Sequence, residues 1–163
     1  MRHKLKEERF KNLKKLNIIS SSASLPKSHQ RLKPWNDLSN SDKKIESKKM
    51  ELYAGMIENL DFNIGRIINY LKKIDEYENT LIVFMSDNGA AAEDFYNNPI
   101  YGPYLKNNFS VKYDDMGKEN SFISLGTGWA EASSAPFKFF KGLPTQGGIV
   151  SPLIISGYGV GRK

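Results

Sequence analysis

The sequence has 163 residues, of which 39% are hydrophobic and 12% aromatic, enough for the core of one domain and too many for a disordered chain. It contains no cysteine, which excludes disulfides, thiolate metal sites and a cysteine nucleophile within these residues. The net charge is +6, and no apolar run approaches the roughly 20 residues that a membrane-spanning helix requires.

The positive charge is concentrated at the N-terminus. Residues 1–16 carry seven Lys or Arg against two Glu, whereas the rest of the chain carries seventeen against sixteen. We interpret these basic residues mainly as a solvated helix face, with phosphate binding as the alternative, and expect no nucleic-acid partner. Residues 1–38 are thus predicted to form a basic helix and a Pro- and Ser-rich connector. Apolar positions place the helix at 4–16, through Leu5, Phe10, Leu13 and Leu16.

Three side chains of residues 1–38 are candidates for a function, His3 in the basic helix and His29 and Trp35 in the connector. His3 and His29 lie in unrelated contexts, so we expect surface residues rather than a metal site or a catalytic pair. Trp35 stands just before the next predicted helix, where we expect it to act as a packing anchor, with a substrate-lining role as the alternative.

A long amphipathic helix is predicted at residues 39–74. Ser39 followed by Asp42 three residues later forms a plausible N-terminal cap. Apolar residues then recur at spacings of three and four, which predicts a stripe that faces a core. The stripe comprises Tyr53, Met56, Ile57, Leu60, Ile64, Ile67, Ile68 and Leu71.

Two apolar runs predict strands. Leu81 to Met85 is a continuous branched run, typical of a strand buried on both faces in a parallel sheet, and we assign 80–90 to this strand and the turn after it. The run from Gly148 to Ser156 predicts a second strand, within a C-terminal segment at 148–163. Between them, 91–147 is rich in Gly, Asn, Tyr and Ser without a sustained period, and is predicted to be ordered irregular structure around a site.

A helix followed by a strand predicts an α/β fold. Two strands cannot bury both the helix stripe and a two-faced apolar strand, so we expect more sheet than the sequence supplies, and both termini look cut.

The residues after the first strand suggest a ligand site. In open α/β sheets, ligands bind beyond the carboxyl ends of the strands, which is where Asp87 and Asn88 fall, with Gly89 permitting a sharp turn. A carboxylate and an amide oxygen suit Ca²⁺ or Mg²⁺, and the same residues are also common in turns without a metal. Lys141, within an aromatic stretch ahead of the second strand, is a candidate for contact with an anion or a plain surface residue.

These features together resemble the sulfatase family, particularly bacterial arylsulfatases. The resemblance runs through "LYAGMIENLDFNIGRIINYLKKIDEYENTLIVFMSDNGA" and "GWAEASSAPFKFFKGLPTQGGIVSPLIISG", and also through "KLKEERFKNLKKLNI" and "LPKSHQRLKPWNDLS". It covers nearly the whole chain. It implies part of an alkaline-phosphatase-like sandwich, with a mostly parallel or mixed sheet flanked by helices, and places residues 1–163 in one partial catalytic domain.

The resemblance also implies site roles. Asp87 and Asn88 look like two ligands of a divalent cation, usually Ca²⁺ and otherwise Mg²⁺, and Lys141 looks like the lysine that contacts the sulfate group. The implied activity is hydrolysis of sulfate esters, with a sulfate ester as the substrate. A cation and an ammonium in fixed positions would stabilise the charge that develops on the leaving oxygen.

The sequence departs from the family at the nucleophile. Sulfatases oxidise a Cys or Ser within C/S-x-P-x-R to formylglycine, and these residues contain no such motif. The other aspartate ligands and the active-site histidines are also missing. We therefore expect a fragment that is inactive alone, with formylglycine in the parent protein and a missing N-terminal half as a partner.

Two other readings remain open. One is a phosphate- or phosphonate-ester hydrolase of the same superfamily, against which Asn88 argues, since those relatives more often carry His there. The other is a non-catalytic module that uses the basic helix to bind a polyanion. Localisation is not predicted.

Overall fold

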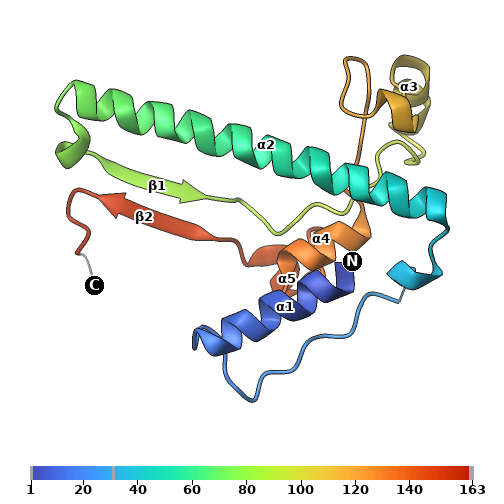
Figure 1. Ribbon diagram of the computed structural model, residues 1–163, viewed down its shortest axis with the longest axis horizontal. Coiled ribbons are helices and arrows are strands. Elements are labelled where there is room, and N and C mark those ends of the chain that lie inside the picture. The colour runs from blue at the N-terminus through green and yellow to red at the C-terminus, as the bar shows by residue number, and fades with distance from the viewer. Residues whose placement is uncertain (1, 31, 162–163) are drawn as a thin grey trace. The chain divides into compact units, whose positions relative to one another are not determined.

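The computed structural model describes residues 2–30 and 32–161, which fall into two units (Figure 1). The first unit comprises 1–52 and 88–150, and the second comprises 53–87 and 151–163. In chain order the helices and strands are α1 (Arg2–Lys15), α2 (Asn40–Lys73), β1 (Leu81–Met85), α3 (Gly102–Asn108), α4 (Thr127–Ser134), α5 (Gln146–Ile149) and β2 (Leu153–Gly157). Short 3₁₀ turns occur at Trp35–Asp37, Tyr77–Asn79 and Tyr113–Asp115.

The core of the first unit forms where α1 packs along α4 (Figure 1). Trp129 of α4 is only 1% exposed, and its indole N–H donates to the carbonyl oxygen of Glu46 at 2.8 Å. The alanines at 130 and 132 of the same helix are also buried, so α1 approaches α4 closely. Trp35 lies edge-on to Trp129 with ring centroids 6.1 Å apart, in agreement with its predicted role as a packing anchor.

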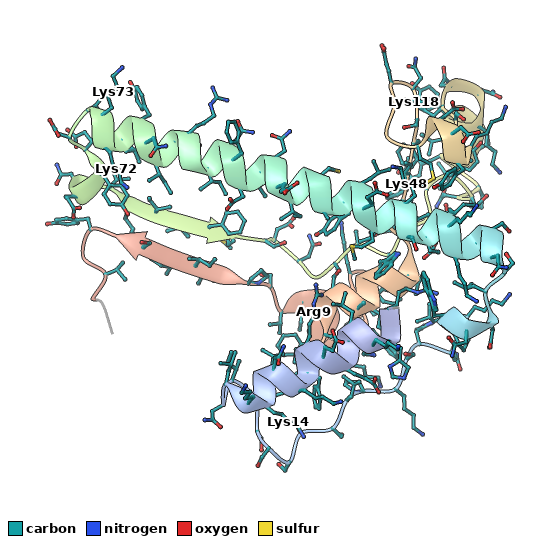
Figure 2. The ribbon with its side chains drawn as sticks, in the orientation of Figure 1. Arg9, Lys14, Lys48, Lys72, Lys73 and Lys118 are labelled. Carbon is teal, nitrogen blue, oxygen red and sulfur yellow. The ribbon has the colours of Figure 1, made fainter. Side chains whose placement is uncertain are left out.

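Helix α1 matches the predicted N-terminal helix, but the reading of its basic residues as a solvated face is wrong in part. Its most buried side chains are Arg2 and Lys6, whereas the apolar positions are half-buried and Leu16 is exposed. Arg9 donates to the carbonyl oxygen of Ala132 at 3.0 Å. Figure 2 labels Arg9 and Lys14 of α1 and shows that basic side chains also occur outside this helix, at Lys48, Lys72 and Lys73 of α2 and at Lys118.

Helix α2 begins as the sequence predicts and lies partly in each unit. The hydroxyl of Ser39 accepts from the backbone N–H of Asp42 at 3.1 Å and donates to its carboxylate at 2.7 Å. The expectation that the apolar stripe faces a core is not met in this chain, because α2 has no buried residue. Met56 and Ile67, for example, are 70% and 61% exposed. Much of the apolar stripe of α2 is therefore in contact with solvent in this chain.

The second unit contains the two strands, which pair antiparallel with Met85 opposite Leu153 and Leu81 opposite Gly157 (Figure 1). Both strands are largely exposed. The predicted strand at 81–85 therefore exists, but the prediction that it is buried on both faces beside a parallel neighbour is wrong for this chain. The physical reason is that a two-stranded ribbon offers nothing to cover either face.

The segment 91–147 is partly regular. It contains α3, α4 and the start of α5, joined by turns, and most of the buried side chains of the first unit lie in it. The second strand begins later than predicted. Gly148 and Ile149 form the end of α5, and β2 starts only at Leu153. In the described part of the chain, no helix has both the length and the apolar character to cross a membrane.

Candidate functional site

The candidate site begins where β1 ends. The backbone N–H of Ser86 donates to the carbonyl oxygen of Pro152 at 3.3 Å, which closes the strand pair. Asp87 follows as an exposed residue, the last of its segment of the second unit. Asn88, half-buried, is the first residue of the next segment of the first unit. Asp87 therefore does lie at the exit of a strand, as the sequence predicts.

The turn that continues from Asn88 is attached to the C-terminal part of the first unit. The backbone N–H of Gly89 donates to the carbonyl oxygen of Gly148 at 3.0 Å. A side chain at Gly89 would overlap the carbonyl oxygen of Gly147. Glycine is therefore needed for this close approach, and not for the positive φ that a sharp turn would demand, since Gly89 is absent from the residues with positive φ.

Lys141 lies in a second segment that is hydrogen-bonded to the same turn. Its backbone N–H donates to the carbonyl oxygen of Ala90 at 3.0 Å, so the segment that carries it runs beside the turn after Asn88. The structure thus brings Lys141 and the Asn88–Ala90 turn together within the first unit, although they are about 50 residues apart in the sequence.

The loop that presents Lys141 is strongly constrained. Phe139 and Gly142 have φ values of 65° and 90°, so the backbone is left-handed on both sides of the lysine. The hydroxyl of Thr145 and the backbone N–H of Gly147 both donate to the carbonyl oxygen of Lys138, at 2.8 and 2.9 Å. Phe140 is buried and anchors the loop in the core. These contacts fix the backbone of Lys141, whose side chain is partly exposed.

The ammonium of Lys141 is only loosely paired. Its Nζ lies 3.7 Å from Oε1 of Glu93, and the two side chains are 42% and 34% exposed. A pair that long and that exposed contributes at most about 1 kcal/mol, so an anion can replace Glu93 at little cost. The other carboxylate oxygen of Glu93 is buried and has no hydrogen-bond partner among the described residues. Sequence reasoning missed Glu93, which has no periodicity or motif to mark it.

The carboxylate of Asp87 and the side-chain amide of Asn88 each contain an oxygen of the kind that hard cations bind. Their chemistry fits Ca²⁺ or Mg²⁺, and Ca²⁺ takes six to eight oxygens in all. Among residues 2–30 and 32–161 there is no cluster of three or more His, Cys, Asp or Glu that would complete the set. The donor chemistry of each residue, taken by itself, is therefore of the type that suits such a cation.

A buried ion pair in the first unit was also missed. Nζ of Lys6 lies 2.6 Å from Oε1 of Glu131, with both side chains less than a tenth exposed. Burial by itself would raise the pKa of Glu131, but hydrogen bonds from Lys6, the His29 backbone and Ser28, with the charge of Lys6, hold that pKa below its ordinary value. The one signal in the sequence is a lone carboxylate among the small residues of "GWAEASS".

His29 is not the plain surface residue that the sequence suggests. Its backbone N–H donates to Oε2 of Glu131 at 3.0 Å, and its ring meets the ring of Phe139 edge-on at 5.1 Å. His29 therefore contacts both Glu131 of α4 and the loop that carries Lys141. Lys138 of that loop is exposed, with Nζ 4.8 Å from the ring centroid of Phe139.

Comparisons with known proteins give a consistent result. The family model described as Sulfatase matches residues 14–163. An uncharacterized sulfatase of Schizosaccharomyces pombe is 40% identical over 154 residues, which cover 93% of this chain and 28% of that protein. An arylsulfatase of Klebsiella aerogenes is 39% identical over 158 residues, 95% of this chain and 33% of that protein.

A shorter match extends the comparison. An N-acetylglucosamine-6-O-sulfatase of Bacteroides thetaiotaomicron is 50% identical over 40 residues, 24% of this chain and 7% of that protein. The chain thus spans a third or less of the length of these relatives.

Proposed function

Because the chain belongs to the sulfatase family, we propose that it forms part of the active centre of a hydrolase that cleaves sulfate esters. The resemblance read from the sequence is confirmed, and so is the α/β fold class, since the helices and the two-stranded pair are compatible with part of the sulfatase fold. The finer statements that follow, on residues, cation and substrate, are our proposals.

Lys141 is proposed to contact the sulfate group of the substrate. A sulfate monoester carries a negative charge, and more charge develops on the leaving oxygen as the ester bond breaks. A positioned ammonium lowers the energy of that charge without reorganising during the reaction. Lys141 has the required character, because its backbone is fixed by the bond to Ala90 while its ammonium, among the described residues, has only the long pair with Glu93.

Asp87 and Asn88 are proposed to supply two ligands of a divalent cation, Ca²⁺ or Mg²⁺. When bound, such a cation supplies positive charge that stabilises an oxyanion. The role of these residues is to offer hard oxygens after the end of β1. The hydrogen bond from the backbone N–H of Gly89 to the carbonyl oxygen of Gly148 holds the turn after Asn88 in place.

The nucleophile is proposed to come from outside these 163 residues. The family resemblance implies formylglycine, and neither cysteine nor C/S-x-P-x-R occurs in the sequence. We infer that the chain alone does not turn over substrate and acts with a second segment that supplies the nucleophile and the remaining ligands. The observation that carries the proposal is the backbone bond between Lys141 and Ala90, which supports a shared role for the lysine and the turn.

A chimaera tests the proposal. The chain replaces the matching segment of the Klebsiella aerogenes arylsulfatase, and hydrolysis of 4-nitrophenyl sulfate is measured with and without Ca²⁺. We expect activity, and a loss of about 100- to 1,000-fold in kcat on Lys141→Ala, the size seen when a group that stabilises transition-state charge is removed. Asp87→Ala should raise the Ca²⁺ concentration needed for activity.

The controls separate the site from the fold. Lys138→Ala, in the same loop, should leave the rate unchanged. Equal rates for the Lys138 and Lys141 variants would show that the assignment of Lys141 is wrong. A phosphate ester of the same leaving group tests the other chemistry of the superfamily, and faster hydrolysis of that ester than of the sulfate would favour a phosphatase.

A further inference from the structure

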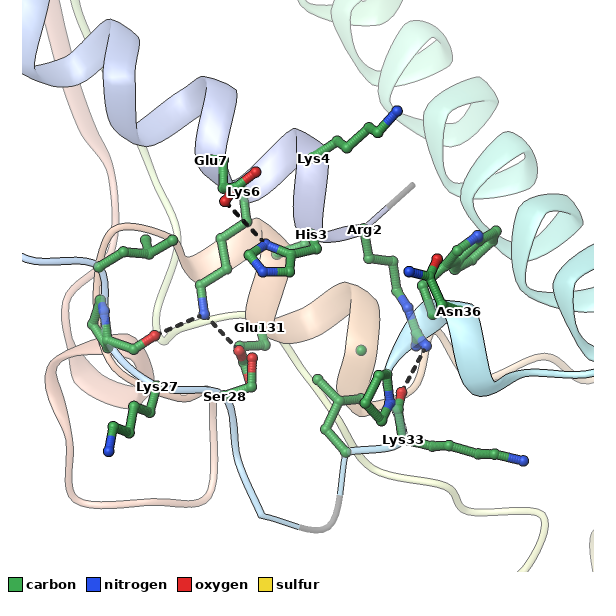
Figure 3. Close-up of a pocket in the computed structure, with 17 residues that line it drawn as sticks. Arg2, His3, Lys4, Lys6, Glu7, Lys27, Ser28, Lys33, Asn36 and Glu131 are labelled. Carbon is green, nitrogen blue, oxygen red and sulfur yellow. Dashed lines mark hydrogen bonds and ion pairs between the residues drawn. The ribbon is translucent and has the colours of Figure 1, made fainter.

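The first unit contains a cavity of about 590 Å³ that is separate from the candidate site. It is bordered by α1, by residues 25–28 and 32–36 of the connector and by α4, as Figure 3 shows. Its volume is within the range of small-molecule sites, roughly 300 to 1,000 Å³. Neither Asn88 nor Lys141 lines it.

The walls of this cavity are held by charged side chains that are already paired. Lys6 binds Glu131 at 2.6 Å and also donates to the carbonyl oxygen of Pro26 at 3.3 Å, which fixes the connector to α1 and α4 (Figure 3). Arg2 donates to Glu46 at 3.1 Å and to the carbonyl oxygen of Lys33 at 3.3 Å. The cavity is therefore formed in advance, so a ligand would not have to order the connector.

The lining combines an apolar surface with few neutral polar groups. The neutral polar side chains are His3, Ser28 and Asn36, too few to satisfy the many hydroxyls of a sugar. The guanidinium of Arg2 lies 5.4 Å from the ring centroid of Trp35. The apolar lining is supplied mainly by the connector, through Leu25, Pro26, Leu32, Pro34 and Trp35. This lining suits a flat apolar group, such as an aromatic ring.

The edge of the cavity carries an excess of positive charge. Lys4, Lys27 and Lys33 line it, and within the described part of the chain their ammonium groups have no ion pair or hydrogen bond. Figure 3 shows them around the edge with their ammonium groups directed outward. Of the two acidic residues of the lining, Glu131 is paired with Lys6, and the half-exposed carboxylate of Glu7 lies 3.8 Å from Nδ1 of His3. The three lysines outnumber this one carboxylate, so an anion at the mouth meets a net positive charge.

We propose that this cavity binds an aromatic anion, with its ring against the apolar lining and its sulfonate, sulfate or carboxylate group at the lysine-bearing edge. The ring gains burial of apolar surface, and the charged group stays near water, where it avoids a desolvation cost. The site does not depend on the proposed hydrolase function, because it shares none of that function's residues.

Nuclear magnetic resonance of the two indole N–H groups of the 163-residue chain tests the proposal. The probe is p-toluenesulfonate, and p-toluenesulfonamide is the neutral analogue of the same shape. We expect p-toluenesulfonate to shift the Trp35 signal saturably, with a dissociation constant of about 1 mM or lower. Trp129, which is 1% exposed and bonded to Glu46, should shift less. The neutral analogue should bind at least about tenfold more weakly, the effect of losing about 1.4 kcal/mol of charge attraction.

Variants separate the cavity from other cationic surfaces. The double variant Lys27→Gln and Lys33→Gln should weaken binding about tenfold, because both residues are exposed at the edge and their loss removes charge without disturbing the core. The matched control, Lys11→Gln with Lys15→Gln, removes the same charge from exposed positions of α1 that do not line the cavity, and should bind as the parent does.

Three results would overturn the proposal: a shift of Trp35 that does not saturate, equal affinity for the neutral analogue, or equal weakening by the control pair. Lys141→Gln should leave binding intact. A loss of binding in that variant would instead place the probe at the candidate sulfate site, so failure here and failure of the proposed function give different patterns.

Discussion

The two units of the chain differ in which kinds of side chain they bury and which they expose. In the first unit, charged residues are buried and paired, with Lys6 and Glu131 both less than a tenth exposed. In the second unit, the residues best suited to a core are on the surface, and Met85 and Ile154 are 62% and 59% exposed. Burial is thus decided by what each segment can pack against, not by its hydrophobicity alone.

This comparison bears on where the stability of the chain resides. The first unit has a buried indole, buried alanines and satisfied ion pairs, all of which are lost together on unfolding. The second unit has a strand pair whose side chains gain little on folding, because they stay in contact with water. We therefore expect substitutions in the first unit to lower the free energy of unfolding far more than those in the second.

The largest effect is expected for Glu131→Leu. It leaves the ammonium of Lys6 buried without a carboxylate, which costs about 3 to 5 kcal/mol when one member of a buried pair is removed. Urea unfolding followed by circular dichroism measures the change. Glu51→Leu is the matched control, since its pair with Lys48 is exposed at 69% on the Glu51 side and should contribute less than about 1 kcal/mol.

The double variant Lys6→Met with Glu131→Leu sharpens this test. Two apolar side chains of similar volume remove the uncompensated charge, and should recover most of the lost stability. Equal losses for the single and the double variant would show that the cost comes from packing and not from the buried charge.

The next effect is expected at the turn after β1. Gly89→Ala introduces a methyl group into the space of the Gly147 carbonyl oxygen, a backbone atom that cannot rotate away. Overpacking of this kind costs about 1 to 3 kcal/mol. Gly65→Ala, in α2, meets nothing within 4 Å and should stabilise the helix by about 0.5 to 1 kcal/mol. Changes of the same sign at both positions would contradict the close approach of Gly89.

Acid should weaken the first unit through Glu131. Its pKa in the folded protein is lower than the ordinary value of 4.5, so its contribution is complete above that value and is lost as the pH falls through the folded pKa. Thermal unfolding between about pH 6 and pH 2 measures the slope, over the range in which carboxylates titrate. Glu131→Gln removes the titrating group and should flatten the acid side of the profile. An unchanged slope in that variant would assign acid sensitivity to other carboxylates.

What the sequence predicts well is local. The cap of α2 needs only Ser39 and Asp42, three residues apart, and the existence of β1 needs only a run of branched residues. The position of Asp87 after that strand follows directly. These features depend on neighbours in the chain, so the pattern of residues contains the necessary information.

What the sequence does not predict depends on distant partners. Lys6 is buried because Glu131 lies against it, 125 residues away, and a basic helix gives no sign of this. Gly89 is required by the carbonyl oxygen of Gly147, not by its own backbone angle. The exposure of β1 has the same origin, since whether a strand is buried depends on the elements that cover it. Site roles for Asp87, Asn88 and Lys141 remain predictions that rest on resemblance.

The smallest effect is expected in the second unit. Val83 and Ile155 face each other across the strand pair and are 50% and 46% exposed. Replacing both with threonine keeps the β-branched shape and removes little buried apolar surface, so the free energy of unfolding should fall by less than about 1 kcal/mol.

The matched substitution in the first unit is Phe140→Ala, which removes a buried ring and should cost about 3 to 5 kcal/mol. The threonine pair should also raise solubility, because two exposed apolar side chains on a strand pair become polar. A loss above about 2 kcal/mol for the threonine pair would mean that these side chains are buried in solution, by self-association or by contact with another segment. Sedimentation velocity distinguishes those two cases. Self-association makes the sedimentation coefficient rise with protein concentration, whereas contact with another segment of the same chain does not.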